Sequence, residues 1–284
     1  ASIKSVGPSG AIWADLTIML FMVIAGTNFT LLYFFAVGRP LKMLKDIEWR
    51  TYALTLITVT LLIVLFGYSH RDALFYFEND TWGSMTSGLR QSGFQVVSIM
   101  TTTGFSSVAD FDQWNTFGRG ALFLLMFVGG CAGSTGGGLK VIRHIMFLKT
   151  LRLELEKAYH PTVVRPLRIG GEAVDDQIRK NILVYFALIL VIFVFSWLFL
   201  ITIEPDNTWH HEGSKLEHKL IDSASGVAAT LNNIGPGLGT VGAKKTYAHF
   251  SPPAKILFTW LMMIGRLEIF AVLVLFLPGF WRSR

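Results

Sequence analysis

Residues 99–107 read Ile-Met-Thr-Thr-Thr-Gly-Phe-Ser-Ser, a short polar stretch with a glycine that lies between two apolar segments. A second stretch of this kind, Leu-Asn-Asn-Ile-Gly-Pro-Gly-Leu-Gly, covers residues 231–239. Lipid cannot hydrogen-bond bare backbone, so non-helical chain at membrane depth survives only inside protein or along a watery path. Because rings of backbone carbonyls can replace the water shell of an ion, the two stretches predict the filters of a cation pore.

The composition is that of an integral membrane protein. Of the 284 residues, 52% are hydrophobic and 15% are charged, whereas a soluble domain carries about a quarter charged residues. Apolar runs of about 20 residues can cross a bilayer. We expect five spans, over residues 11–37, 51–68, 117–148, 181–203 and 252–280.

The net charge of +6 reflects orientation in a membrane, so we expect lipid and no nucleic acid as a partner. The basic residues gather in segments 41–50 and 140–180 and at the C-terminus, and basic loops stay on the cytoplasmic side. Five spans then place the N-terminus outside, which suits a fragment. The single cysteine, Cys131, excludes an internal disulfide.

The two filter candidates belong to an internal repeat. Gly104 and Gly235 lie 131 residues apart, and short apolar segments (84–100 and 220–230) precede their stretches. Each unit contains a span, a short re-entrant pore helix, a filter loop and a second span. The expected fold class is therefore an all-α integral membrane protein of parallel repeats, about an axis along the membrane normal. Two such units enclose half a ring.

The third predicted span is interrupted by residues 129–138, where six of ten positions are glycine. Each glycine costs about 1 kcal/mol relative to alanine in a helix, so this stretch is predicted to be non-helical. It is no phosphate-binding loop, because Leu139 separates the last glycine from Lys140. A helix kink packed against a neighbour is the alternative to a functional loop.

Arg266 is a charge inside the last predicted span. Such a charge is costly and usually faces a partner or water. In the repeat alignment it falls opposite the glycine-rich stretch, so we expect it to contact the carbonyls there. A structural pair with Glu268 is the alternative.

The remaining polar residues predict no enzyme, because no catalytic or metal-binding constellation lies within the spans. His210, His211 and His218 are poorly spaced for a metal in an exposed loop, and we expect them to be solvated.

Four motifs together resemble the TrkH family, the membrane subunits of the bacterial Trk potassium uptake systems. They are Thr-Thr-Thr-Gly-Phe at 101–105, Gly-Gly-Cys-Ala-Gly-Ser-Thr-Gly-Gly-Gly-Leu-Lys-Val-Ile-Arg at 129–143, Leu-Asn-Asn-Ile-Gly-Pro-Gly-Leu-Gly at 231–239 and Gly-Arg-Leu-Glu-Ile-Phe at 265–270. They occur in the correct order, and the match covers essentially the whole chain. The family pattern does not cover the loop 204–219.

The resemblance implies four repeats, of which this chain would hold the end of the second and all of the third and fourth. Residues 1–49 would end the second repeat and form a cytoplasmic link, and 151–178 would be a basic cytoplasmic linker between the third (50–150) and the fourth (179–284). Potassium would bind the filter residues Thr102, Thr103, Gly104, Asn232, Asn233, Ile234 and Gly235. The gate would comprise Arg266 and the loop residues Gly129, Gly130, Gly133, Ser134, Thr135, Gly136, Gly137 and Gly138.

The function implied is gated potassium uptake, driven by the membrane potential, with ion coupling left open. Potassium would be the ion handled, without an organic cofactor. We also expect a bacterial inner-membrane location, a homodimer and a cytosolic ring of nucleotide-binding TrkA subunits docked on residues 140–180. The alternatives are a subunit of an ATP-driven potassium pump and a membrane scaffold or sensor that transports nothing.

Overall fold

The computed structural model describes residues 8–69, 81–106, 111–160, 167–209, 216–267 and 269–282. The regular secondary structure of this part of the chain is helical apart from one antiparallel hairpin, in which Arg168 pairs with Ala173 and Ile169 with Glu172. The elements, in order, are α1 (Pro8–Ala25), α2 (Phe29–Ala36), α3 (Pro40–Lys45), α4 (Ile47–Ser69), α5 (Thr81–Met100), α6 (Thr116–Leu125), α7 (Val141–Tyr159), β1 (Arg168–Ile169), β2 (Glu172–Ala173), α8 (Asp176–Ile203), α9 (Leu216–Leu231), α10 (Pro252–Leu267), α11 (Ile269–Val274) and α12 (Pro278–Arg282), with short 3₁₀ turns at Phe111–Gln113, Asp206–Trp209, Gly239–Val241 and Tyr247–His249.

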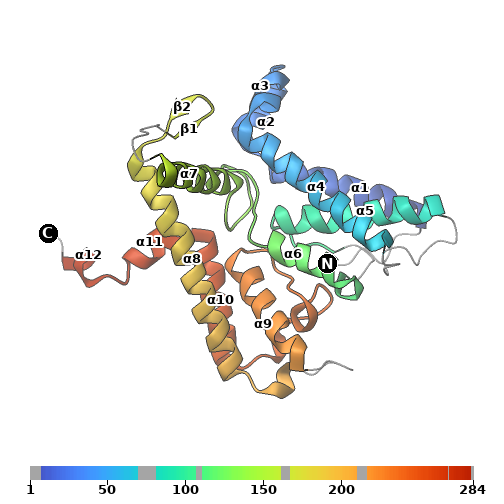
Figure 1. Cartoon of the computed structure of the whole chain (residues 1–284). Helices are drawn as coiled ribbons and strands as arrows, with labels where there is room; N and C mark the ends of the chain where they lie inside the picture. The colour runs from blue at the N-terminus through green and yellow to red at the C-terminus, as the bar shows by residue number, and fades with distance from the viewer. Residues whose placement is uncertain are drawn as a thin grey trace.

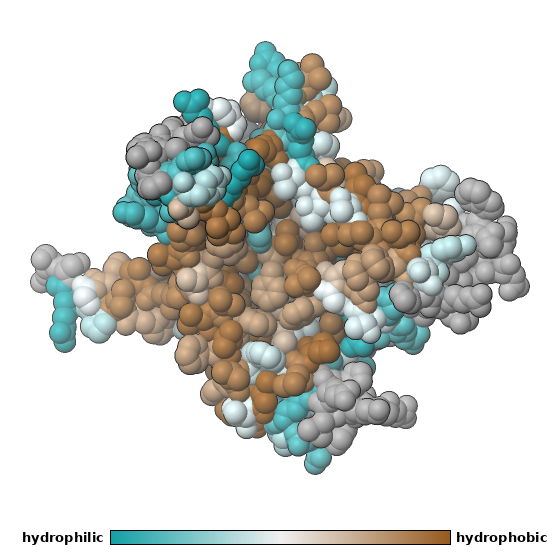
Figure 2. Space-filling view, in the orientation of Figure 1, coloured by the Kyte–Doolittle hydropathy of each residue, from teal (hydrophilic) through white to brown (hydrophobic). Residues whose placement is uncertain are grey.

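Two helices in the described part, α4 and α8, are long and apolar enough to cross a membrane unbroken, with 23 and 28 residues. A rise of about 1.5 Å per residue makes each longer than the apolar thickness of about 30 Å. α8 packs beside α9 and α10, while α4 packs on α5 (Figure 1). The visible surface is apolar across its middle, and hydrophilic residues gather near α3, α7 and the hairpin (Figure 2). This surface fits a protein that lies in lipid.

The predicted span over residues 11–37 is corrected to two helices, α1 and α2, that meet at a bend of 108°. Asn28 caps α2, because its side-chain oxygen accepts from the backbone N–H of Thr30 at 2.8 Å. At the bend, Gly26 lies close to Tyr52 and Thr101. A Cβ added to Gly26 would lie 2.6 Å from the Tyr52 hydroxyl and 2.7 Å from Thr101. Backbone at the bend is thereby free to bond to other segments.

The predicted spans over 117–148 and 252–280 are also broken. α6 has ten residues and ends at Leu125, and α7 begins only at Val141. The predicted non-helical stretch 129–138 lies between them. At the other end of the chain, α10 ends at Leu267 and is followed by the short helices α11 and α12. The expectations for Glu268, His210, His211 and the side chain of His218 lie outside the described residues.

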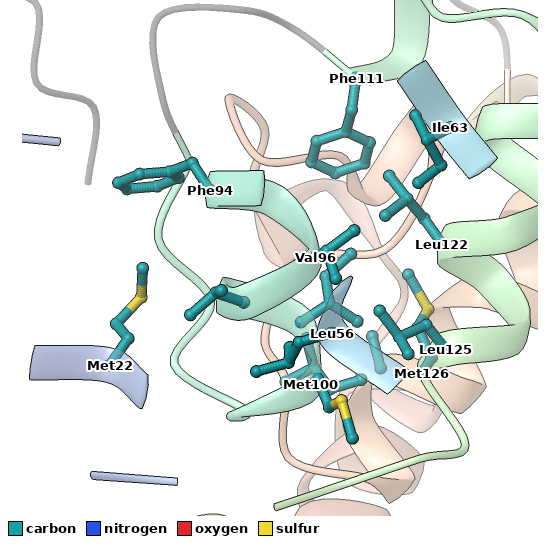
Figure 3. Close-up of a cluster of buried hydrophobic side chains, with 14 of the residues drawn as sticks. Met22, Leu56, Ile63, Phe94, Val96, Met100, Phe111, Leu122, Leu125 and Met126 are labelled. Atoms are coloured by element: carbon teal, nitrogen blue, oxygen red, sulfur yellow. The ribbon is translucent and has the colours of Figure 1, made fainter. Parts of the chain in front are cut away.

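Two hydrophobic clusters hold the described helices together. The first gathers side chains from α4, α5 and α6, and Figure 3 shows Ile63, Val96 and Leu122 pointing into it. The second joins α8, α9 and α10 through residues such as Val227 and Leu261. Packing of this kind, rather than release of water, is what associates helices in lipid. α5 contributes residues to the first cluster and α9 to both, and each of these helices ends at a predicted filter.

Candidate ion filter and gating loop

The first filter candidate begins where α5 ends, at Met100. The backbone N–H of Thr102 donates to the carbonyl of Ile99 at 3.0 Å, and that of Thr103 to Ser98 at 2.9 Å. Thr102 then adopts a φ of 54° and Gly104 a φ of 75°. A positive φ is a genuine outlier for a β-branched residue such as threonine. Strain of this kind persists only where the surroundings enforce it, and it is concentrated at functional sites.

The second filter candidate repeats this backbone. α9 ends at Leu231, after which Asn233 has a φ of 57° and Gly235 a φ of 105°. The N–H of Asn233 donates to Thr230 at 3.2 Å, and that of Ile234 to Ala229 at 2.8 Å. Every donor, acceptor and positive φ lies 131 residues after its counterpart in the first stretch, as 102 and 233 illustrate.

The two stretches meet. A Cβ added to Gly104 would lie 2.2 Å from the carbonyl oxygen of Ile234 and 3.0 Å from Pro236, so this position has room for glycine alone. Both stretches line a cavity of about 350 Å³ together with residues of α9 and α10. Five predicted filter residues line it: Thr102, Thr103, Asn233, Ile234 and Gly235.

The glycine-rich loop is closed at its base by its own backbone. The N–H of Gly129 donates to the carbonyl of Leu139 at 2.7 Å, and the N–H of Val141 donates to Gly130 at 3.1 Å. The two ends of the loop approach each other so closely that a Cβ on Gly129 would lie 2.7 Å from the carbonyl oxygen of Leu139. The glycines are thus required by close approach as well as by helix breaking.

The tip of the loop lies against both filter candidates. The N–H of Gly137 donates to the Thr102 hydroxyl at 2.9 Å, and a Cβ on Gly137 would lie 2.8 Å from that of Asn233. A Cβ on Gly138 would lie 2.9 Å from the side-chain oxygen of Asn232. The structure therefore brings the predicted filter and gating residues together in one place.

The bent end of α1 also holds the loop. The carbonyl of Ala25 accepts from the N–H and the hydroxyl of Thr135, each at 3.1 Å, and the carbonyl of Gly26 accepts from Cys131 at 2.9 Å. In return the carbonyl of Gly133 accepts from the N–H of Phe29 at 3.2 Å. These are helix-end groups that have no partner within their own helices.

Arg266 makes the contact that the sequence predicts. Its Nη1 donates to the carbonyl of Thr135 at 2.9 Å. The neighbouring Gly265 carbonyl accepts from Gly138 at 3.4 Å, and the Lys140 ammonium donates to the carbonyl of Gly136. Two cations therefore hold carbonyls of the loop. The alternative pair with Glu268 lies outside the described residues.

Sequence reasoning missed the acidic and phenolic groups that support this region. Glu48 accepts hydrogen bonds from the N–H groups at the loop base, Asp112 accepts from Gly239 at 2.8 Å, and Asp222 accepts from Thr240 at 2.9 Å. The Tyr247 hydroxyl donates to the carbonyl of Gly235 at 2.9 Å. The available signal was weak: Glu48 is an acidic residue within the basic segment 41–50, three residues before the predicted span that begins at 51.

Comparisons with known proteins show which proteins the chain and its fold resemble. The chain is 36% identical to the Trk system potassium uptake protein TrkH of Salmonella typhimurium, over 94% of this chain and 50% of the relative. It is 29% identical to TrkG of Escherichia coli, over 99% of this chain and 53% of the relative. The crystal structure of the potassium transporter TrkH from Vibrio parahaemolyticus superposes with a TM-score of 0.81, at 32% identity, over 99% of this chain and 55% of that one.

The chain spans about half the length of the curated relatives it matches. The family profile described as TrkH, cation transport protein, matches residues 2–282, nearly all of the chain. The profile and the structural match show a helical membrane protein, and the chain belongs to the TrkH family of cation transport proteins.

Proposed function

We propose that the protein takes up potassium through a gated pathway in which residues 102–104 and 232–235 form part of the selectivity filter. The observation that carries this proposal is the similar backbone of the two stretches, which follow two buried helices and line one cavity. Carbonyls arranged around such a space can replace the water shell of a cation. The relatives are named potassium uptake proteins, which supports potassium as the substrate.

In this proposal the two units are parallel repeats, over residues 50–150 and 179–284. α5 and α9 are their re-entrant pore helices, and each ends at a filter loop without crossing the membrane. The shared offset of 131 residues supports the repeat. The relatives are about twice as long as this chain, which supports a ring completed by further units of the same kind.

The loop 129–138 is the gate of this pathway and is closed in the conformation described. Support comes from its tip, which bonds to Thr102 and lies against Asn233. Arg266 holds it there through the carbonyl of Thr135. Withdrawal of the tip would open the space below the filter to ions.

The membrane potential drives uptake, because moving one charge through 100 mV yields about 2.3 kcal/mol. The protein lies in a bacterial inner membrane as a multi-pass homodimer. Its basic segment at residues 140–180 docks a cytosolic ring of nucleotide-binding subunits, and the excess of basic over acidic residues in this segment supports this orientation.

The deciding experiment measures rubidium and sodium uptake into liposomes that carry the intact transporter, with and without Gly104→Ser. Serine at this position must overlap the Ile234 carbonyl, so we expect rubidium-selective uptake to fall at least about tenfold. The matched control is Gly38→Ser. Gly38 also has a positive φ, of 77°, but no atom of the described residues lies within 4 Å of its Cβ position.

The outcomes separate the candidate functions. A loss with Gly104→Ser and little change with Gly38→Ser supports the filter. Rubidium uptake that is unchanged by Gly104→Ser, or that is absent from the unaltered protein, favours a scaffold or sensor. Uptake that requires ATP hydrolysis by a partner favours the pump subunit.

A further inference from the structure

Glu48 is a buried carboxylate that no filter or gate assignment uses. It lies in the first turn of α4 and is 6% exposed. Its Oε1 accepts from the backbone N–H of Ala132 at 2.7 Å and from that of Ile142 at 3.2 Å. One oxygen thus joins two points that are ten residues apart in sequence, on either side of the loop tip.

The two N–H groups have few other choices of partner. Ile142 is the second residue of α7, so its N–H is among the four at a helix start that lack an intrahelical acceptor. Ala132 lies in the loop itself, where the glycine-rich backbone forms no helix. A partly buried backbone donor needs a partner from protein or water. Hydrogen bonds to a charged acceptor are about twice as strong as those between neutral groups.

The start of α4 is itself held in place. Tyr52, one helical turn after Glu48, is fully buried, and its hydroxyl donates to the carbonyl of Val23 at 3.3 Å. α4 also packs along α5, the helix that leads to the first filter. Glu48 therefore fixes the loop base relative to the same helices that position the filter.

We propose that Glu48 is a positioning residue that clamps the base of the loop 129–138 and so keeps its tip against the filter. Arg266 holds the tip, and Glu48 holds the base. The part of this inference that concerns ion flux rests on the proposed function. The clamp itself can be tested without transport.

Cys131 is the probe for the clamp. It is the single cysteine of this chain, is fully buried, and precedes Ala132. The experiment measures the rate at which a membrane-permeant maleimide labels Cys131 in the intact transporter, with the label located by peptide mass spectrometry. Loss of the clamp should free the loop base and expose this thiol. We expect labelling to accelerate about tenfold in Glu48→Ala and a few-fold in Glu48→Gln, which keeps one acceptor oxygen.

The matched control is Asp46→Asn, which removes a neighbouring negative charge. Asp46 accepts from the N–H of Trp49 at 2.8 Å at the start of α4 and makes no hydrogen bond to the loop. We expect its labelling rate to stay within about twofold of the unaltered protein. The Glu48→Gln variant keeps the test valid if Glu48→Ala does not fold.

Rubidium and sodium uptake by the same variants gives the second readout. The clamp predicts higher basal rubidium uptake for the Glu48 variants with an unchanged rubidium-to-sodium ratio. Equal labelling rates in the Glu48 variants and the unaltered protein would overturn the clamp, and so would equal acceleration by Asp46→Asn. Faster labelling in a protein that takes up no rubidium would leave the clamp in place and reject the proposed function.

Discussion

The two filter stretches have the same backbone but different supports. In the first, the Thr102 hydroxyl accepts from the loop at Gly137, and Gly104 is crowded by Ile234. In the second, the Asn233 amide donates to the carbonyl of Met262 in α10 at 3.1 Å. No described atom lies within 4 Å of the Cβ position of Gly235.

This difference separates the contacts that shape the two proposed filter stretches from the contacts that join them to the proposed gate. The hydrogen bonds that turn the chain after α5 and α9 are backbone to backbone, so they recur whatever the side chains are. The side chains at the matching positions 102 and 233 reach different partners, one in the loop and one in α10. The first stretch is therefore hydrogen-bonded directly to the proposed gate through the Thr102 side chain. The second stretch also touches the loop at Gly137 and Gly138, but the side chain of Asn233 hydrogen-bonds to α10, the helix that carries Arg266.

The largest expected effect compares serine at the two matching glycines. Both substitutions force a side chain into positive φ, which costs about 1–2 kcal/mol. Only Gly104→Ser adds an overlap with backbone, at 2.2 Å. We expect rubidium uptake to fall about a hundredfold in Gly104→Ser and about tenfold in Gly235→Ser, since about 1.4 kcal/mol corresponds to a factor of ten. Equal losses of rubidium uptake by the two variants in liposomes would show that the overlap with the Ile234 carbonyl has no effect of its own.

The next effect concerns the two side chains at the matching positions. Thr102→Val keeps the shape but leaves the N–H of Gly137 without its acceptor, a cost of about 1–3 kcal/mol. We expect basal rubidium uptake to rise about tenfold, while Thr102→Ser stays near the unaltered value. Asn233→Gly removes the amide without backbone strain and should change basal uptake only about twofold. If basal rubidium uptake rose more in Asn233→Gly than in Thr102→Val, the second stretch rather than the first would be the one joined more strongly to the gate.

A smaller effect is expected from the exposed Arg266. Arg266→Ala loses one hydrogen bond to the loop tip, and we expect basal uptake to rise about fivefold. Arg266→Lys keeps the positive charge and a hydrogen-bond donor, so basal uptake should rise less in this variant. Arg282→Ala removes a cation from α12 and serves as the control. Unchanged uptake in Arg266→Ala would refute the gate assignment for this residue.

The smallest effect concerns Tyr247, which supports the second filter through the Gly235 carbonyl. Tyr247→Phe removes one neutral hydrogen bond, worth about 1 kcal/mol, and should lower the rubidium-to-sodium ratio about twofold. Burial raises the pKa of the Tyr247 phenol, so its support is present at low pH and is lost only as pH rises through that raised pKa. The ratio in the unaltered protein should thus stay flat between about pH 6 and pH 9. Tyr33→Phe, on the exposed side of α2, is the control.

Apolar pattern alone predicted the helices that lead to the filters. The segments expected at 84–100, 220–230 and 181–203 correspond to α5, α9 and α8, each somewhat longer at its start. These helices are long runs bounded by glycine, proline or charge, and such limits can be seen in sequence. The glycine-rich break at 129–138 was predictable for the same reason, because six glycines cannot hold a helix.

The remaining features depend on partners that are distant in sequence. The bend between α1 and α2 involves the Asn28 cap and the close approach of Tyr52 to Gly26, where no side chain fits. A hydropathy average over the segment detects neither feature. Glu48 meets its partners 84 and 94 residues away. No spacing rule in the sequence connects positions so far apart. From the sequence alone, Glu48 is therefore one more charged residue of the basic segment, and only the fold shows that it contacts the loop.

The loop has one further consequence, for hydration. The backbone N–H groups of Cys131, Ala132, Thr135, Gly137 and Gly138 all donate to acceptors outside the loop. If the tip withdraws, lipid cannot replace those acceptors, and only water can. Opening of the proposed pathway therefore requires water to hydrate backbone N–H groups that bind protein acceptors in the closed state. Solutes too large to enter should draw that water out again, so osmotic stress would hold the loop shut.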